Sequence, residues 1–149
     1  MTLDSDNTAP RRSAIMTTRI IWAALLMGQV VFLAVVLTLR QNAEESDAAK
    51  TSPISHMLFY TGVFMLIVAV PAAYFLRSTI YRRGGSDRNV TPQAYITGNI
   101  LFLAICEGVS FVGLIGILLS GTMWPHLAIS MVAIAVQSLN FPTGNVMCA

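Results

Sequence analysis

The sequence predicts an all-α, polytopic membrane protein with four transmembrane helices and with both termini in the cytoplasm (N-in/C-in). Charged residues make up only 11% of the 149 residues, whereas a soluble domain carries about 25%. Hydrophobic residues make up 55%, and they gather in four blocks. Within these blocks apolar and polar residues do not alternate, as they do in the strands of a membrane β-barrel. This composition argues against a soluble domain, a disordered chain and a nucleic-acid-binding protein.

Each block is long enough for a helix that crosses the hydrocarbon layer, which takes about 20 apolar residues for roughly 30 Å. In lipid the backbone must satisfy its own hydrogen bonds, and this requirement favours helices. We expect one membrane domain over residues 1–149, in which residues 1–18 form a disordered cytoplasmic tail. The four helices are predicted at about residues 19–39, 54–77, 95–120 and 123–141.

The basic residues predict the orientation of the helices. Seven of the nine lie before the first block or between the second and the third, and only Arg40 and Lys50 lie between the first and the second. Because basic residues concentrate in cytoplasmic loops, the side with seven is expected to be cytoplasmic. These seven residues are Arg11, Arg12, Arg19, Arg77, Arg82, Arg83 and Arg88.

One charged residue lies inside a block. Glu107 falls near the centre of the third block, where an ionised carboxylate costs at least about 2.5–3.5 kcal/mol. No block contains a basic residue that could form an ion pair with it. We therefore expect the carboxyl group to be neutral much of the time, so that it both donates and accepts a hydrogen bond. The candidate partners at similar depth are Gln29, Ser110 and Ser130.

Two interpretations of Glu107 stay open. In the first, Glu107 binds a proton or a sodium ion during transport, with Gln29, Ser110 and Ser130 completing the ion-binding site. In the second, Glu107 forms a structural contact between helices, which is worth about 1–2 kcal/mol.

Small residues of the third block form two stripes on opposite sides of the predicted helix. One stripe holds Thr97, Ala104 and Gly108, and the other holds Gly113, Gly116 and Ser120. Small residues allow the backbones of two helices to approach closely. We therefore predict helix packing at Ala104, Gly108, Gly113 and Gly116, and a central position for the third helix.

The sequence offers no pattern for enzymatic chemistry. It contains no pairing of a nucleophile with a base and no cluster with metal-ligand spacing, so we expect no enzyme activity, no cofactor and no metal site. His56 and His126 lie near the outer ends of predicted helices, where we expect them to be interfacial polar residues.

Two families resemble parts of this chain. The segments Ala104-Ile105-Cys106-Glu107-Gly108, Gly113-Leu114-Ile115 and Asn140-Phe141-Pro142-Thr143 resemble an uncharacterised group of small bacterial four-helix integral membrane proteins. That resemblance implies a multi-pass protein of the bacterial plasma (inner) membrane, without an assigned activity.

The second resemblance is confined to the third block. Glu107 followed by Gly113-Leu114 resembles the carboxylate helix of the ATP synthase subunit c proteolipid. In that family the carboxylate binds the translocated proton or sodium ion, and the resemblance implies the same role for Glu107.

Two functional hypotheses follow from these observations. The first is a structural or accessory membrane protein whose helices pack around a mid-membrane glutamate. The second is a proton- or sodium-binding proteolipid-like or transporter component that uses Glu107. Under both, the expected partners are the lipid bilayer and either further copies of the chain or other membrane proteins, and no nucleic acid.

Overall fold

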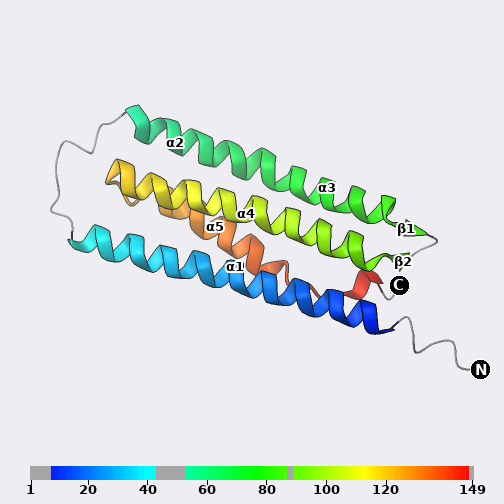
Figure 1. The fold of residues 1–149 in the computed structure, drawn as a ribbon. Helices are drawn as coiled ribbons and strands as arrows, with labels where there is room; N and C mark the ends of the chain where they lie inside the picture. The colour runs from blue at the N-terminus through cyan, green and yellow to red at the C-terminus, as the bar shows by residue number, and fades with distance from the viewer. Residues whose placement is uncertain (1–7, 43–52, 87–88, 148–149) are drawn as a thin grey trace, which may run out of the picture.

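A computed structural model describes residues 8–42, 53–86 and 89–147. Its elements form an elongated bundle of helices with one short β-hairpin at an end (Figure 1). The helices are α1 (Thr8–Asn42), α2 (Pro53–Phe64), the π-helix η2 (Met65–Ala69), α3 (Val70–Arg83), α4 (Pro92–Ser120), α5 (His126–Leu139) and the 3-10 helix η3 (Asn145–Met147). The strands are β1 (Gly85–Ser86) and β2 (Asn89–Val90), which pair antiparallel.

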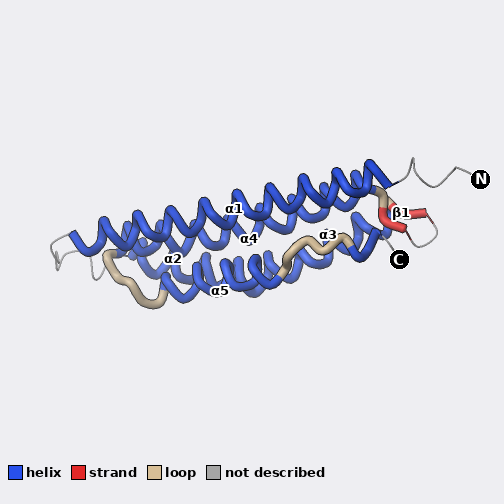
Figure 2. The backbone as a smooth tube through the Cα atoms, turned by 90° about the horizontal axis from the view of Figure 1, so that it is seen from below, coloured by secondary structure: helices blue, strands red, loops and turns tan. Residues whose placement is uncertain are grey.

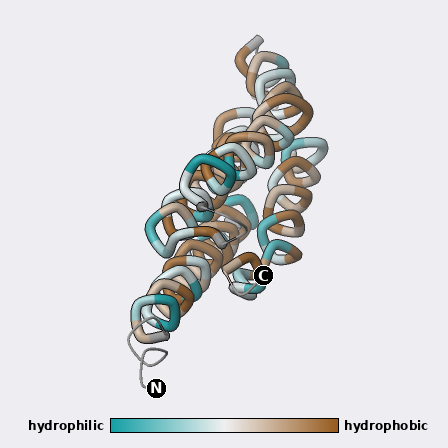
Figure 3. The backbone as a smooth tube through the Cα atoms, turned by 90° about the vertical axis from the view of Figure 1, so that its right-hand side faces the viewer, coloured by the Kyte–Doolittle hydropathy of each residue, from teal (hydrophilic) through white to brown (hydrophobic). Residues whose placement is uncertain are grey.

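The architecture is all-α, and three of its helical segments are long and apolar enough to cross a membrane. They are Ala9–Gln41, Ile54–Arg83 and Pro92–Ser120, and the second of them combines α2, η2 and α3. The chain is therefore a multi-pass membrane protein by helix length and hydropathy. The lipid-facing sides of such helices are apolar, and apolar residues indeed lie on the outer as well as the inner sides of the bundle (Figure 3).

The fourth predicted helix is shorter than expected. We predicted residues 123–141, but α5 has 14 residues, which span about 21 Å and not the full hydrocarbon layer. After α5 the chain continues without helical structure between Asn140 and Gly144 and then forms η3 (Figure 2). Pro142 has no N–H group and restricts the residue before it, and Gly144 has a φ of +82°, so a helix cannot continue here.

The first helix begins earlier than predicted. Residues 8–18, which we expected to belong to a disordered tail, form the first turns of α1, whereas residues 1–7 lie outside the described residues. Ala14 and Thr18 are buried, and the side chain of Ile15 lies against Gly144. This part of the helix is therefore held by packing against the C-terminal segment, which is far away in the sequence.

The π-helix η2 ends at Ala69, two residues before Pro71. Because proline cannot donate a backbone hydrogen bond, a regular helix would leave the carbonyl group four residues earlier without a donor. The backbone widens here by one residue, and the N–H group of Val70 donates to the carbonyl oxygen of Met65. The apolar segment stays helical across the proline.

Helix α4 is the centre of the bundle, because it packs against α1, α2, α3 and α5. Half of its most apolar stretch is buried, compared with 11% for α1 and 17% for the segment of α2, η2 and α3. Three clusters of buried apolar residues follow α4 along its length. They are centred on Phe102, Leu103 and Cys106, on Val109, and on Leu114 and Ile117.

The arginines gather at one end of the bundle. The beginning of α1, the end of α3, the β-hairpin and η3 all lie at this end (Figure 1). We call it the basic end, and its described basic residues are Arg11, Arg12, Arg19, Arg77, Arg82 and Arg83. Arg40 lies in the last turn of α1, at the opposite end.

Candidate functional site

Glu107 occupies the middle of the central helix. It lies fifteen residues after Pro92 and thirteen before Ser120, the two ends of α4. Its side chain is half-buried and forms no hydrogen bond or ion pair with any described residue. The six other acidic residues of the chain lie outside the described residues. They are Asp4, Asp6, Glu44, Glu45, Asp47 and Asp87.

Several residues beside Glu107 on α4 are not covered by the described helices, although Phe111, one turn further on, packs against Phe32 of α1 with 5.2 Å between ring centroids. Ala104 is exposed, and a Cβ atom added at Gly108 would have no neighbouring atom within 4 Å. Ile100 and Ile115 are 37% and 41% exposed. We call these five residues the Glu107 face. Of the two stripes of small residues, the one with Ala104 and Gly108 therefore has no described helix in close contact with it.

The other stripe lies directly against α5. A Cβ atom added at Gly113 would overlap the hydroxyl group of Ser130 and lie 2.8 Å from the carbonyl oxygen of His126. A Cβ atom added at Gly116 would overlap the imidazole ring of His126. Only a residue without a side chain lets α4 and α5 approach this closely.

The predicted partners of Glu107 bond to other groups. The Nε2 atom of Gln29 donates to the Oε1 atom of Gln137 at 2.6 Å, and the hydroxyl group of Ser130 donates to the carbonyl oxygen of Ser110 at 2.9 Å. Gln29, Ser110 and Ser130 are all fully buried, whereas Glu107 is half-buried. Glu107 forms no hydrogen bond with any of these three residues, although Ser110 lies only three residues further along α4.

Gln137 forms a buried polar contact that the sequence did not indicate. Besides its side-chain bond to Gln29, its carbonyl oxygen accepts a hydrogen bond from the Nε1 atom of Trp22 at 3.0 Å. The Oε1 atom of Gln29 and the Nε2 atom of Gln137 have no partner among the described residues. The pair therefore links α1 to the end of α5 through one amide hydrogen bond. One acceptor and one donor of the two amide groups remain without a hydrogen-bond partner among the described residues.

His126 is a second buried polar residue. It begins α5, near the end of the helix as expected, but it is fully buried by protein, and its ring packs on Gly116. Its Nε2 atom lies 3.4 Å from the hydroxyl group of Ser55, and Phe59 packs edge-on at 6.3 Å between ring centroids. His126 thus joins the beginning of α5 to both α2 and α4. The glycine at position 116 was the sequence signal for this contact.

Known proteins give no further indication of function. Comparison of the chain with models of protein families, with curated proteins and with solved structures finds no match in any of the three. Its function is therefore inferred from the chemistry of its own residues.

The contact between α4 and α5 predicts opposite effects of two glycine substitutions. Gly113→Ala places a methyl group against Ser130 and His126, and we expect it to lower the free energy of unfolding by about 2 kcal/mol. Gly108→Ala is the matched control, because it meets open space and alanine favours a helix. Unfolding by SDS in micelles at a high detergent-to-protein ratio measures both. Equal stabilities of the two variants would contradict the packing described here.

The two buried glutamines predict a non-additive pair of substitutions. Gln29→Leu leaves the side chain of Gln137 buried without a partner, and we expect it to lower the free energy of unfolding by about 1 kcal/mol. In the double variant Gln29→Leu/Gln137→Leu no amide is left unpaired, so the loss should be smaller than in the single variant. The same SDS unfolding measurement tests this. If the stability lost in the double variant equals the sum of the losses in Gln29→Leu and Gln137→Leu, the pairing of the two side chains is refuted.

Proposed function

We propose that this chain is a small multi-pass membrane protein with a structural or accessory, non-enzymatic role, and that it assembles through the Glu107 face of α4. The observation that supports the proposal is a carboxyl group at the middle of a membrane helix, half exposed and without a partner in the described chain. A polar group facing lipid at this depth is costly, and a contact with another helix removes that cost. Ala104 and Gly108 beside it are small enough for a second backbone to approach closely.

The proposed partner is a second copy of the chain. If the two-fold axis of the dimer passes close to the centre of the Glu107 face, Glu107 faces Glu107 of the second copy. Two neutral carboxyl groups are complementary to each other, because each has one donor and one acceptor. The uncharged blocks of the sequence contain no basic residue that could serve instead.

The proposed location is the plasma membrane of a bacterium, with the basic end in the cytoplasm. The location rests on the resemblance of the segments around Glu107 and Pro142 to small bacterial four-helix membrane proteins. The orientation rests on the distribution of the basic residues.

Disulfide cross-linking tests the assembly. In a background with Cys106→Ala and Cys148→Ala, we expect Ala104→Cys to form a disulfide-linked dimer when the protein is oxidised in a bilayer. Ile67→Cys is the matched control, because Ile67 is 68% exposed and lies near the middle of another span. Cross-linking that is equal at the two positions, or absent at position 104, would contradict the proposal.

Two substitutions of Glu107 separate a packing role from an ion-carrying role. Glu107→Gln keeps a donor and an acceptor, so the dimer should survive. Glu107→Leu removes both, and we expect dimerisation to weaken by about tenfold. Energy transfer between labelled copies in bilayers measures the dimer over a range of dilutions. A leucine variant that dimerises like the parent would show that the carboxyl group does not hold the copies together.

Ion binding is the second candidate function, and the same free carboxyl group favours it. With no described partner, Glu107 is available to a proton or a sodium ion that arrives along the Glu107 face. Its resemblance to the carboxylate of the subunit c proteolipid supports this alternative.

Carbodiimide labelling tests the alternative. Dicyclohexylcarbodiimide reacts with a protonated carboxyl group in an apolar environment, so we expect an ion-binding Glu107 to be labelled and sodium to slow the reaction. The Glu107→Gln variant sets the background. Failure of the parent protein to react above this background, as measured by mass spectrometry, would exclude a titrating carboxyl group.

A further inference from the structure

Arg19 is held in place by the segment that follows α5. Its Nε atom donates to the carbonyl oxygen of Pro142 at 3.2 Å, and its guanidinium carbon lies 5.1 Å from the centre of the Phe141 ring. Trp22 in turn packs edge-on against Phe141, with 5.1 Å between ring centroids. The guanidinium group is therefore held at its Nε edge by a hydrogen bond and on one face by an aromatic ring.

Arg77 has the same arrangement on another helix. Its Nε atom donates to the hydroxyl group of Tyr81 at 2.9 Å, and its guanidinium carbon lies 5.4 Å and 5.6 Å from the ring centres of Tyr81 and Phe102. The Nδ2 atom of Asn99 also donates to the Tyr81 hydroxyl group, at 2.7 Å, and this bond fixes the tyrosine.

Both arginines keep their terminal N–H groups free of the protein. The described residues provide no hydrogen-bond acceptor to these groups and no carboxylate at the basic end. A guanidinium group that is oriented through Nε and an aromatic ring loses little further freedom when its terminal N–H groups bind an oxyanion. Its planar geometry fits two oxygens of a phosphate group.

The positions of the two arginines along the sequence agree with the depth of lipid phosphates. Arg19 directly precedes the uncharged block that starts at Ile20, and Arg77 directly follows the block that ends at Leu76. Both guanidinium groups therefore lie at the boundary of the hydrocarbon layer, where headgroup phosphates are found.

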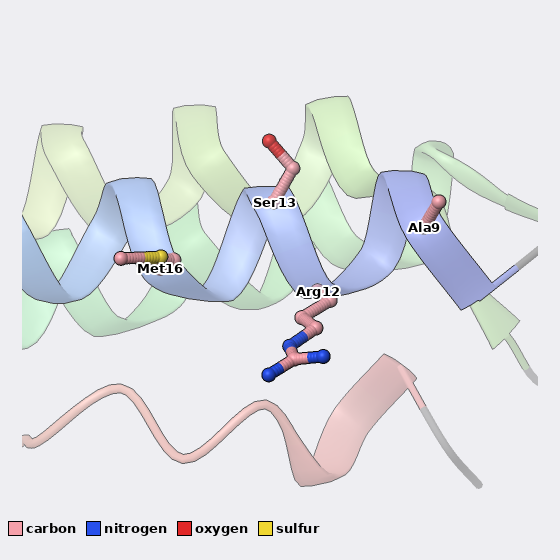
Figure 4. A pocket seen from close by; sticks show the side chains of 4 residues that line it. All are labelled: Ala9, Arg12, Ser13 and Met16. Carbon is pink, nitrogen blue, oxygen red and sulfur yellow. The ribbon is translucent and has the colours of Figure 1, made fainter.

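Between Arg19 and its N-terminus, the surface of α1 carries a second basic side chain. A hollow lined by Ala9, Arg12, Ser13 and Met16 lies on α1, and Arg12 extends from it toward the C-terminal segment (Figure 4). Arg12, Met16 and Arg19 are spaced four and three residues apart and so share one face of the helix. Met16, which is 64% exposed, adds apolar surface between the two cations.

We propose that the basic end binds anionic phospholipids, with the terminal N–H groups of Arg19 and of Arg77 each holding the phosphate of one lipid. The lipids come from the leaflet that faces the basic end. Arg12 adds attraction for the negative charge of the lipid at Arg19. The proposal is independent of the assembly through the Glu107 face, because the two surfaces share no residue.

Trp22 is a natural reporter for the lipid at Arg19. In a Trp124→Phe variant Trp22 is the only tryptophan of the chain. Bromine on lipid chains quenches tryptophan fluorescence at short range. The fluorescence of the protein is therefore compared in two kinds of vesicle made of phosphatidylglycerol and phosphatidylcholine. In the first only the phosphatidylglycerol is brominated, and in the second only the phosphatidylcholine is brominated. We expect phosphatidylglycerol to be preferred over phosphatidylcholine about fivefold at this site.

Substitutions at position 19 separate charge from geometry. We expect Arg19→Gln to abolish the preference and Arg19→Lys, which keeps the charge but not the planar group, to reduce it about twofold. Arg83→Gln is the control, because Arg83 is exposed at the same end and forms no hydrogen bond with a described residue. A preference that is absent in the parent, or unchanged in Arg19→Gln, would overturn the proposal.

Counting the retained lipids tests both sites together. Native mass spectrometry of the protein released from bilayers of the two lipids should show two phosphatidylglycerol molecules per copy of the chain in the parent and one per copy in either Arg19→Gln or Arg77→Gln. Retention that is equal in the parent and in both variants would overturn the assignment of the lipids to these arginines.

Discussion

A polar group in the hydrocarbon layer needs a hydrogen-bond partner from protein, and this constraint governs the arrangement of the bundle. Several polar side chains of the spans find such a partner inside the chain. Gln29 bonds to Gln137 and Ser130 to the backbone of Ser110, and these bonds join α1 and α4 to the short helix α5. Glu107 is an exception at the surface of the described bundle, because it is only half-buried and forms no hydrogen bond with a described residue. The exception is the basis of the proposed assembly.

The existence and approximate position of the helices could be predicted from the sequence, because a membrane span requires about 20 mostly apolar residues. Apolar blocks of about 20 residues predicted four transmembrane helices, of which three are long and apolar enough to cross a membrane. The position of Glu107 in its block predicted its place in the middle of α4. The end of α5 was predicted too late in the sequence. The apolar residues continue to Phe141, so the apolar pattern does not show that the helix ends at Leu139, shortly before Pro142 and Gly144. The start of α1 was placed too late for a different reason. Ala14 and Ile15 are ordered by contacts with residues far away in the sequence.

The faces of the helices could be predicted only in part. Helical periodicity separated two stripes on α4, but both stripes consist of small residues, so their composition does not tell which one contacts another helix. Only the structure shows that Gly113 and Gly116 contact α5 and that Ala104 and Gly108 do not. The hydrogen-bond partners could not be predicted either, since Gln29 and Gln137 are 108 positions apart and several polar residues lie at similar depth. Which of them meet depends on how the helices rotate to fit the glycines.

The central claim is that the Glu107 face is covered by another protein helix rather than by lipid. Solid-state NMR of the deuterated protein in protonated lipid tests it directly, through magnetisation transfer from lipid CH₂ groups to the side-chain carboxyl carbon of Glu107. The Glu107→Gln variant identifies its signal among those of Glu44 and Glu45. We predict weak transfer to Glu107 and strong transfer to Ile67 and Phe75, which are 68% and 71% exposed on another span. Transfer to Glu107 as strong as to those two residues would show that lipid covers the face, and would contradict the account.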